Sequence, residues 1–393
     1  TVINRCPSSV YKYIEIKLHS RLNPQLYDHF QDRMKYLESS IHAIHFVSPQ
    51  DIIVVCDNSA DEKQINNIIM EGIEIATKVD VEFAEERVIF DNLQADYVPR
   101  DYTGELIKKG YVQSSKKGFY SFSGPVKKLL DILDRKFYKI AKELNCKDIS
   151  LPSIISTDDL MMAGHFDTFP HHIYLVSNLD LTSKKTSSKK CCEAGNLHNS
   201  SVHSGVCLTP SVCYNYFRLL KDKNITTINS SLITARCKCY RYELSDVAPF
   251  RRQKEFDMRE IVYLGDAKTV ETIRMKLIEM TWSIIKEYDI KARVVNASDP
   301  FFLDDIAART AIQFNREMKF ELQAYYSKHE SLAVSSFNLH SSSFVKSFNI
   351  NSEIDNLVSS CAGWGLERWA LILFSRFSTK PEKWPEEFQD IFK

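Results

Sequence analysis

Two short β-strands joined by a polar, arginine-bearing loop are expected between residues 237 and 265, CKCYRYELSDVAPFRRQKEFDMREIVYLG. Residues 239–244 and 256–264 have the β-branched and aromatic content of strands, and the loop between them is charged. Because side chains alternate along a strand, Arg241 and Glu243 are expected on one face of the first strand. The segment therefore predicts an antiparallel sheet whose edge or surface carries a row of polar groups.

The same segment is typical of a site for a nucleoside triphosphate. Arg252 lies in the loop, and Phe256 begins the second strand. Guanidinium groups bind phosphate oxygens through two parallel hydrogen bonds, and an aromatic ring can stack on a base. The alternative is that these are surface arginines of an ordinary hairpin.

A second cluster, CAGWGLERWA, spans residues 361–370. Gly363 and Gly365 allow a strand to approach another backbone closely, and Arg368 opens an apolar helix that includes residues 369–374. An arginine at a helix start beside such glycines is again a phosphate-binding arrangement. In this order along the chain, the two clusters reinforce each other.

Together the two clusters resemble motifs 2 and 3 of the class II aminoacyl-tRNA synthetases. The matching strings are Arg241-x-Glu243, Arg252, Phe256 and Gly363-x-Gly365-x-Glu367-Arg368. A helix at 126–145, followed by a strand at 149–155 that contains Pro152, looks like their motif 1, which forms a dimer interface. The resemblance covers residues 118–378. It implies an α+β fold with an antiparallel sheet flanked by helices, and a homodimer in which the apolar face of helix 126–145 is partly exposed in the isolated chain.

Three further stretches are similar to the amino acid:carrier-protein ligases, which are relatives of the atypical zinc-dependent seryl-tRNA synthetases. They are GHFDTFPH at 164–171, LTPSVC at 208–213, and KFEL at 319–322 with Glu330-Ser331 and Ser336-Phe-Asn338 after it. That family holds zinc with a cysteine, a motif 2 glutamate and a second cysteine. The resemblance assigns these places to Cys213, Glu243 and Cys361, leaving one coordination position open. The alternative is that both cysteines are ordinary buried thiols.

The resemblance also implies a reaction in which an amino acid attacks the α-phosphate of ATP to form an aminoacyl-adenylate. Arg241 would stabilise the α-phosphate, Arg252 and Arg368 would hold the other phosphates, and Phe256 would stack on adenine. Glu330 would carry Mg2+, and zinc would bind the substrate's amino group. Asn338 and Trp364 would border a small side-chain pocket that suits glycine, alanine or serine.

The acceptor of the activated amino acid distinguishes two functions. In the ligases it is the phosphopantetheine thiol of a carrier protein, and in the synthetases it is tRNA. Lys plus Arg and Asp plus Glu both number 51, so the net charge is zero, and no long heptad arm is present. These features favour the carrier protein, with tRNA as the alternative. A catalytically dead relative is disfavoured because Arg241, Arg252 and Arg368 are all present.

The first 115 residues predict a separate small α+β domain, with residues 116–393 forming the catalytic domain. Strands are expected at 10–18, 44–46, 52–56 and 88–90, and helices at 24–39 and 66–78. Binding of tRNA, carrier docking and dimer support remain open as roles for this domain. No apolar run approaches the ~20 residues that span a bilayer, so a cytoplasmic protein with reduced cysteines and no membrane partner is expected. Residues 181–207 are expected to form a polar loop. Cys191, Cys192, His198, His203 and Cys207 in this loop fit no standard zinc finger.

Overall fold

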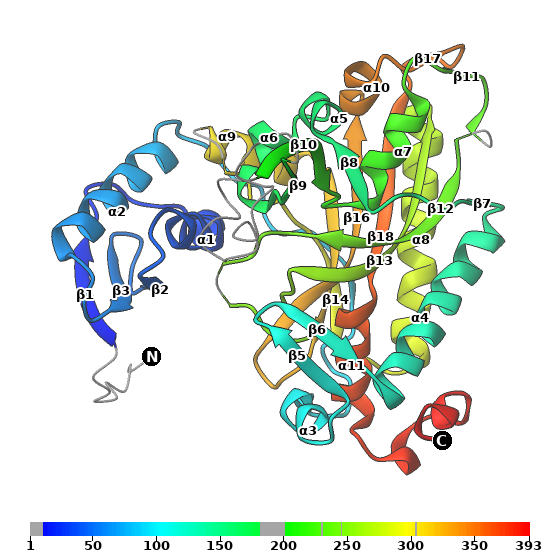
Figure 1. The fold of residues 1–393 in the computed structure, drawn as a ribbon, viewed down its shortest axis with the longest axis horizontal. Helices are drawn as coiled ribbons and strands as arrows, with labels where there is room; N and C mark the ends of the chain where they lie inside the picture. The colour runs from blue at the N-terminus through cyan, green and yellow to red at the C-terminus, as the bar shows by residue number, and fades with distance from the viewer. Residues whose placement is uncertain (1–10, 181–200, 229–230, 245, 303–304) are drawn as a thin grey trace.

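The computed structural model describes residues 11–180, 201–228, 231–244, 246–302 and 305–393 (Figure 1). Cys191, Cys192 and His198 of the predicted polar loop lie outside the described residues. Among the residues described, no helix is both long and apolar enough to cross a membrane.

The N-terminal part forms a small sheet of three antiparallel strands in the order β1-β3-β2. The strands are β1 (Tyr11–Lys17), β2 (Ile41–Phe46) and β3 (Asp51–Asp57), and the helices that pack on them are α1 (Tyr27–Leu37) and α2 (Glu62–Ala76). In α2, Ile65, Ile69 and Ile73 recur every four residues and are all buried against this sheet. The predicted sheet covered by two helices is therefore present.

The last strand predicted for this N-terminal unit belongs elsewhere. Strand β4 (Val88–Asp91) pairs with β14 (Ala292–Asn296), at the edge of the large sheet of the catalytic domain. The prediction that residues 88–90 close the small sheet is wrong, and the predicted boundary near residue 115 falls inside the second unit. Sequence alone does not show which sheet a short strand joins, because its alternation fits either partner.

The large sheet contains eight strands in the order β4-β14-β15-β16-β18-β13-β12-β7. Neighbouring strands are antiparallel except β12 with β7. The remaining strands of this sheet are β7 (Lys147–Asp148), β12 (Ile233–Tyr240), β13 (Glu255–Gly265), β15 (Lys319–Tyr325), β16 (Ser331–Ser341) and β18 (Val358–Gly365). The predicted α+β class with an antiparallel sheet flanked by helices is confirmed.

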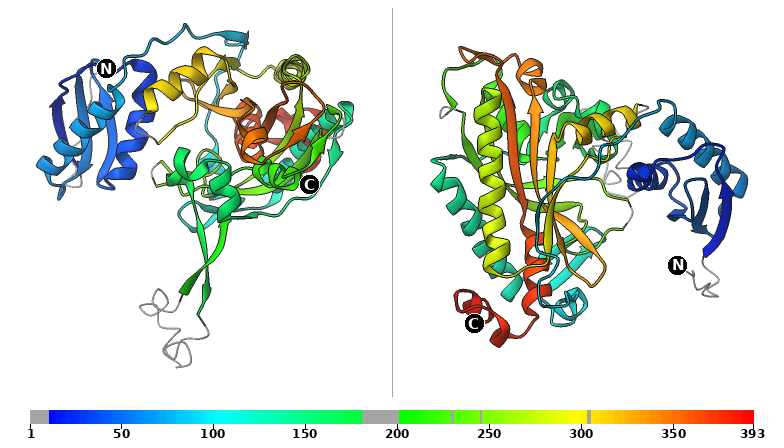
Figure 2. Two further views of the ribbon diagram at one scale, coloured as in Figure 1. Left: turned by 90° about the horizontal axis from the view of Figure 1, so that it is seen from above. Right: turned by 180° about the vertical axis from the view of Figure 1, so that it is seen from behind.

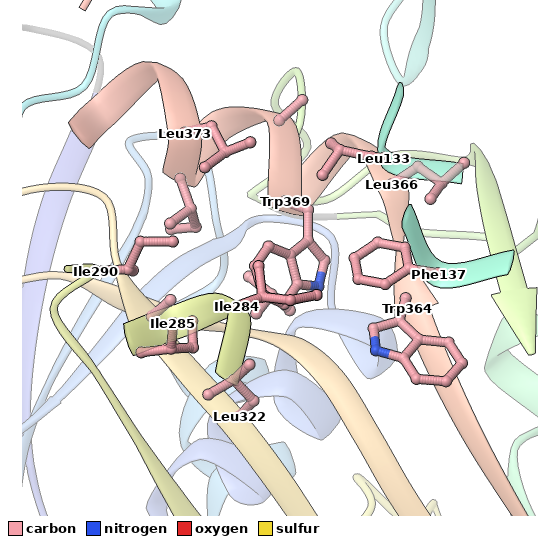
Figure 3. Packing of buried hydrophobic residues seen from close by; sticks show 14 of the residues in the cluster. Leu133, Phe137, Ile284, Ile285, Ile290, Leu322, Trp364, Leu366, Trp369 and Leu373 are labelled. Atoms are coloured by element: carbon pink, nitrogen blue, oxygen red, sulfur yellow. The ribbon is translucent and has the colours of Figure 1, made fainter. Parts of the chain in front are cut away.

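Three long helices share one core with this sheet, as Figure 3 shows for part of it. They are α4 (Gly124–Glu143), α8 (Ala267–Glu287) and α11 (Leu366–Phe377). Phe137 of α4 stacks on Trp364 of β18, with ring centroids 5.2 Å apart. Most apolar residues of α4 are buried in this core, but Ile132 and Tyr138 are only partly buried. The face that was expected to lie partly exposed is therefore mostly covered by α11 and the sheet of the same chain.

Smaller elements surround the sheet and form the walls of a cavity. Helix α7 (Val212–Leu220) and α10 (Ser343–Ser347) contribute to a second apolar cluster with β12, β13 and β18. A separate sheet joins β8 (Ile154–Ser156), β10 (Ser201–Leu208) and β9 (Leu175–Leu179), and Figure 2 shows the β9 and β10 hairpin extending from the body. Residues 201–207, expected in a loop, are therefore a strand. The other elements are α3 (Thr103–Lys108), β5 (Val112–Lys116), β6 (Phe119–Phe122), α5 (Thr157–Met162), α6 (His165–Thr168), β11 (Asn224–Ile225), α9 (Ile306–Asn315) and β17 (Asn351–Ser352).

Candidate active site

A cavity of about 300 Å³ lies where the β12–β13 hairpin meets strands β15, β16 and β18. Most of the residues predicted from the sequence line this one cavity. They are Cys213, Arg241, Glu243, Arg252, Phe256, Asn338, Cys361 and Arg368. The structure therefore brings together groups that are up to 155 residues apart in the sequence.

At one end of the cavity, three metal-binding side chains converge: Cys213 at the start of α7, Glu260 on β13 and Cys361 on β18. One ligand atom from each lies within 4.8 Å of the others, and all three residues are buried. The predicted cysteine pair is therefore brought together, but with Glu260 in place of Glu243.

The register of the sheet explains why Glu260, rather than Glu243, lies beside the two cysteines. Glu260 lies opposite Gly363, and Val262 lies opposite Cys361, so the glutamate and the cysteine share one face of neighbouring strands. A Cβ at Gly363 would lie 3.4 Å from Cγ of Glu260, so glycine leaves room for that side chain. Glu243 follows the end of β12, and its Oε2 lies 3.1 Å from the Tyr36 hydroxyl. No local signal singles out Glu260, because Glu255, Asp257 and Arg259 of the same strand are charged as well.

The electrostatics of the cluster suit a cation. Glu260 Oε1 accepts a hydrogen bond from Ser211 Oγ at 2.8 Å, whereas Oε2 is buried with no hydrogen-bond partner among the described residues. Burial raises the pKa of Glu260 to about 8. The hydrogen bond with Cys213 holds the pKa of the Cys361 thiol well below its usual value, and His340 acts in the same direction. Two thiols and a carboxylate with an unpaired oxygen are a donor set that fits zinc.

Two side chains from β16 contact the sulfur of Cys361. Asn338 Nδ2 lies 3.5 Å from it and His340 Nε2 lies 3.4 Å from it. The sequence analysis included Asn338 but missed His340. The only signal for His340 is its position two residues further along the same strand, which places both side chains on one face.

The predicted arginines line the same cavity. Arg241 Nε donates to the Pro210 carbonyl at 3.3 Å, and its guanidinium lies 5.3 Å from the centroid of the Phe256 ring. Arg368 donates to the carbonyls of Arg251 and Ala333 at 2.9 and 2.8 Å. Burial lowers the pKa of the Arg368 guanidinium to about 10. The three predicted arginines and the aromatic ring thus line one surface.

Two predicted site residues lie elsewhere. Glu330 is exposed in the turn between β15 and β16, where it bonds Ser327, and it does not line the cavity. Glu321 of β15 lines it instead. Trp364 is fully buried in the core behind the sheet, and its Nε1 donates to Thr281 Oγ1 at 3.1 Å. Because adjacent residues of a strand face opposite ways, Trp364 points away from the cavity that its neighbour Gly363 lines.

Buried histidines form another part of the cavity wall. His165 and His172 line the cavity, and His165 Nδ1 lies 2.9 Å from the Tyr214 hydroxyl. Burial lowers the pKa of His165 to about 3 and that of His171 to about 4, so both rings are neutral near pH 7. The structure buries His172 and places the ring of His171 against Tyr36.

Comparison with known proteins identifies relatives of two activities, although no protein-family model matches the chain. A type-2 serine–tRNA ligase from Methanopyrus kandleri is 25% identical over 309 residues, which are 73% of this chain and 59% of that protein. The chain thus matches less than two thirds of that relative's length. Amino acid–[acyl-carrier-protein] ligase 1 from Bradyrhizobium diazoefficiens is 24% identical over 254 residues, or 64% of this chain and 77% of the ligase.

The fold has close counterparts among solved structures. The M. kandleri SerRS, solved in complex with A. aeolicus tRNASec, superposes with a TM-score of 0.69 at 19% sequence identity. The superposition covers 97% of this chain and 77% of that one. These comparisons confirm the predicted resemblance to the class II synthetase superfamily and to its two branches.

Proposed function

We propose that this homologue of type-2 serine–tRNA ligases and amino acid–[acyl-carrier-protein] ligases activates a small amino acid with ATP and transfers it to the phosphopantetheine thiol of a carrier protein. The observation that carries the proposal is the shared cavity. The Cys213, Glu260 and Cys361 cluster lines it together with Arg241, Arg252, Phe256 and Arg368. Such a cavity can hold an amine and a triphosphate with the reacting carboxylate between them.

The arginines supply positive charge near the phosphate groups on which the proposed reaction develops negative charge. When the amino acid carboxylate attacks the α-phosphorus, an oxygen–phosphorus bond forms and the bond to pyrophosphate breaks. Arg241 lines the cavity and would stabilise the extra negative charge of the α-phosphate, and Arg252 and Arg368 would bind the remaining phosphates. Phe256 would provide a ring face for adenine.

The cysteine and glutamate cluster is proposed as a zinc site. When bound, zinc would supply an open coordination position for the substrate's unprotonated amino group. Cys213, Glu260 and Cys361 would hold the metal, and Asn338 and His340 would donate to the Cys361 sulfur and fix its orientation. Asn338 then lies where it can contact the substrate beside the amine.

Magnesium is proposed as the cation that accompanies ATP. Carboxylate oxygens are the ligands that Mg2+ prefers, and Glu321 replaces Glu330 as the candidate because it lines the cavity. Its side chain also lies 2.8 Å from Lys319 Nζ, an ion pair that orients it.

The zero net charge supports a carrier protein as the acceptor, since tRNA-binding surfaces usually carry a basic excess. The match to the ligase also spans 77% of that enzyme. A tRNA acceptor is the second candidate. It is favoured by the superposition on M. kandleri SerRS, which covers 97% of this chain and so includes the N-terminal unit.

A paired assay tests the proposal. Pyrophosphate exchange with each amino acid should identify the activated substrate, and radiolabelled amino acid should then be offered to tRNA and to a phosphopantetheinylated carrier in parallel. Labelled carrier with unlabelled tRNA is the expected result. Labelled tRNA would establish the second candidate, and absence of exchange with every amino acid would contradict both.

A further inference from the structure

Helix α1 of the N-terminal unit packs against the loop that joins β12 to β13, as the ribbon in Figure 1 shows. Lys35 Nζ lies 2.6 Å from the Asp246 carboxylate, and Lys35 is itself only 3% exposed. The Tyr36 hydroxyl donates to the Tyr242 carbonyl at 3.0 Å and lies 3.1 Å from Glu243 Oε2. The helix is therefore fixed to the loop at two successive residues.

One turn before Tyr36, α1 places a carboxylate on an arginine of the cavity. Asp32 Oδ2 accepts hydrogen bonds from both terminal nitrogens of Arg252, at 3.3 and 3.4 Å. Glu243 Oε2 lies 3.6 Å from the same guanidinium. Burial by itself lowers the pKa of Arg252, but Asp32 and Glu243 outweigh it and raise the pKa above its ordinary value. The cation is thus neutralised by protein carboxylates.

A polyphosphate would need the same atoms. Phosphate oxygens bind arginine through the terminal nitrogens that Asp32 now engages. A carboxylate held at this distance would also repel the phosphate, because like charges a few ångströms apart destabilise each other in a partly buried site. Asp32 and the terminal phosphates of ATP are therefore alternatives at Arg252.

We infer that Asp32 is a positioning residue that competes with the polyphosphate of ATP for Arg252, so that the N-terminal unit sets the affinity of the catalytic domain for ATP. The inference rests on the proposed function, which places ATP in this cavity. It gives the N-terminal unit a role in nucleotide binding beyond any contact with the acceptor.

The test compares nucleotides that do and do not reach Arg252. Binding of ATP and AMP to the full chain is measured by titration calorimetry for the native protein, Asp32→Asn and Asp28→Asn. Asp28 is an exposed residue of the same helix and serves as the control. We expect Asp32→Asn to bind ATP roughly threefold or more tightly, on the scale of one ion pair, with AMP binding unchanged, and Asp28→Asn to match the native protein.

A double-mutant cycle separates competition from a general change of structure. In an Arg252→Ala background, Asp32→Asn should strengthen ATP binding less than it does in the native background, because the competition for Arg252 is gone and only the direct repulsion between the carboxylate and the phosphates remains. Unchanged or weaker ATP binding by Asp32→Asn, or an equal change for AMP and ATP, would overturn the inference while leaving the proposed function intact. A native protein that binds no ATP would overturn both.

Discussion

Asn338 and Cys361 face each other across strands β16 and β18, with the Asn338 amide nitrogen 3.5 Å from the Cys361 sulfur. The residue predicted to contact the substrate and a residue predicted to bind the metal are therefore neighbours on one wall. Gly363, two residues beyond Cys361, lines the same wall without a side chain. The groups proposed to recognise the amine and the side chain of an amino acid thus lie side by side.

The metal assignment predicts about one zinc ion per chain, because the cluster supplies a single set of donors. Glu260→Gln and Cys361→Ala should each lose most of this zinc and most of the pyrophosphate exchange activity. Glu243→Gln is the matched control and should retain zinc, because Glu243 lies beside Tyr36 and Arg252 instead. Elemental analysis of the purified variants checks this. Active native protein without zinc, or zinc loss confined to Glu243→Gln, would contradict the assignment.

Arg241→Ala should reduce the rate of adenylate formation by about 10²- to 10³-fold while the protein stays folded, because it removes a charge that acts mainly on the transition state. Arg309→Ala is the control, since Arg309 pairs with Asp305 on the exposed side of α9. Pyrophosphate exchange measures the rates, and circular dichroism verifies the fold. Exchange by Arg241→Ala at the native rate would show that this arginine is not at the α-phosphate.

The pocket should accept glycine, alanine or serine and reject leucine, phenylalanine and lysine. One methylene changes binding by only ~1–3 kcal/mol, so discrimination among the small substrates is expected to be modest. Exchange assays over all amino acids check the preference. Asn338→Ala should alter it, whereas Trp364→Phe should affect stability alone, since Trp364 lies in the core. A large amino acid as the best substrate would contradict the small pocket.

Acid should destabilise the fold through its buried histidines. Burial lowers the pKa of His165 to about 3, below its ordinary value of 6.5. The stabilisation is therefore complete above pH 6.5 and is lost as pH falls, because the unfolded chain takes up a proton that the folded ring does not. At pH 5 the loss from this one group is about 2 kcal/mol. Urea unfolding between pH 7 and 5 should show a smaller decline for His165→Gln than for the native protein.

A twofold homodimer stays a prediction from the resemblance to class II motif 1. An exposed apolar face gives it little support, because most of the apolar side of α4 is buried within its own chain. Sedimentation velocity at micromolar concentration should show twice the mass of the chain. A monomer under these conditions would contradict the predicted homodimer.

The sequence by itself determined the chemistry of the site and the class of the fold. Arg241, Arg252, Phe256 and Arg368 were predictable because their order and spacing on a strand, a loop and a helix start are local features. Cys213 and Cys361 were predictable only through a family resemblance, since nothing local distinguishes them from other buried cysteines.

The tertiary structure decided which side chains meet. Glu260 lies beside Cys213 and Cys361 where Glu243 was predicted, and Trp364 points away from the pocket, because strand register sets the face on which each of these strand residues lies. Glu330 lies in an exposed turn, whereas Glu321 lines the cavity. The contact of Asp32 with Arg252 joins residues 220 positions apart in the sequence. Contacts between residues so far apart in the sequence depend on how the two units pack against each other. The short-range periodicity of a sequence does not predict that packing.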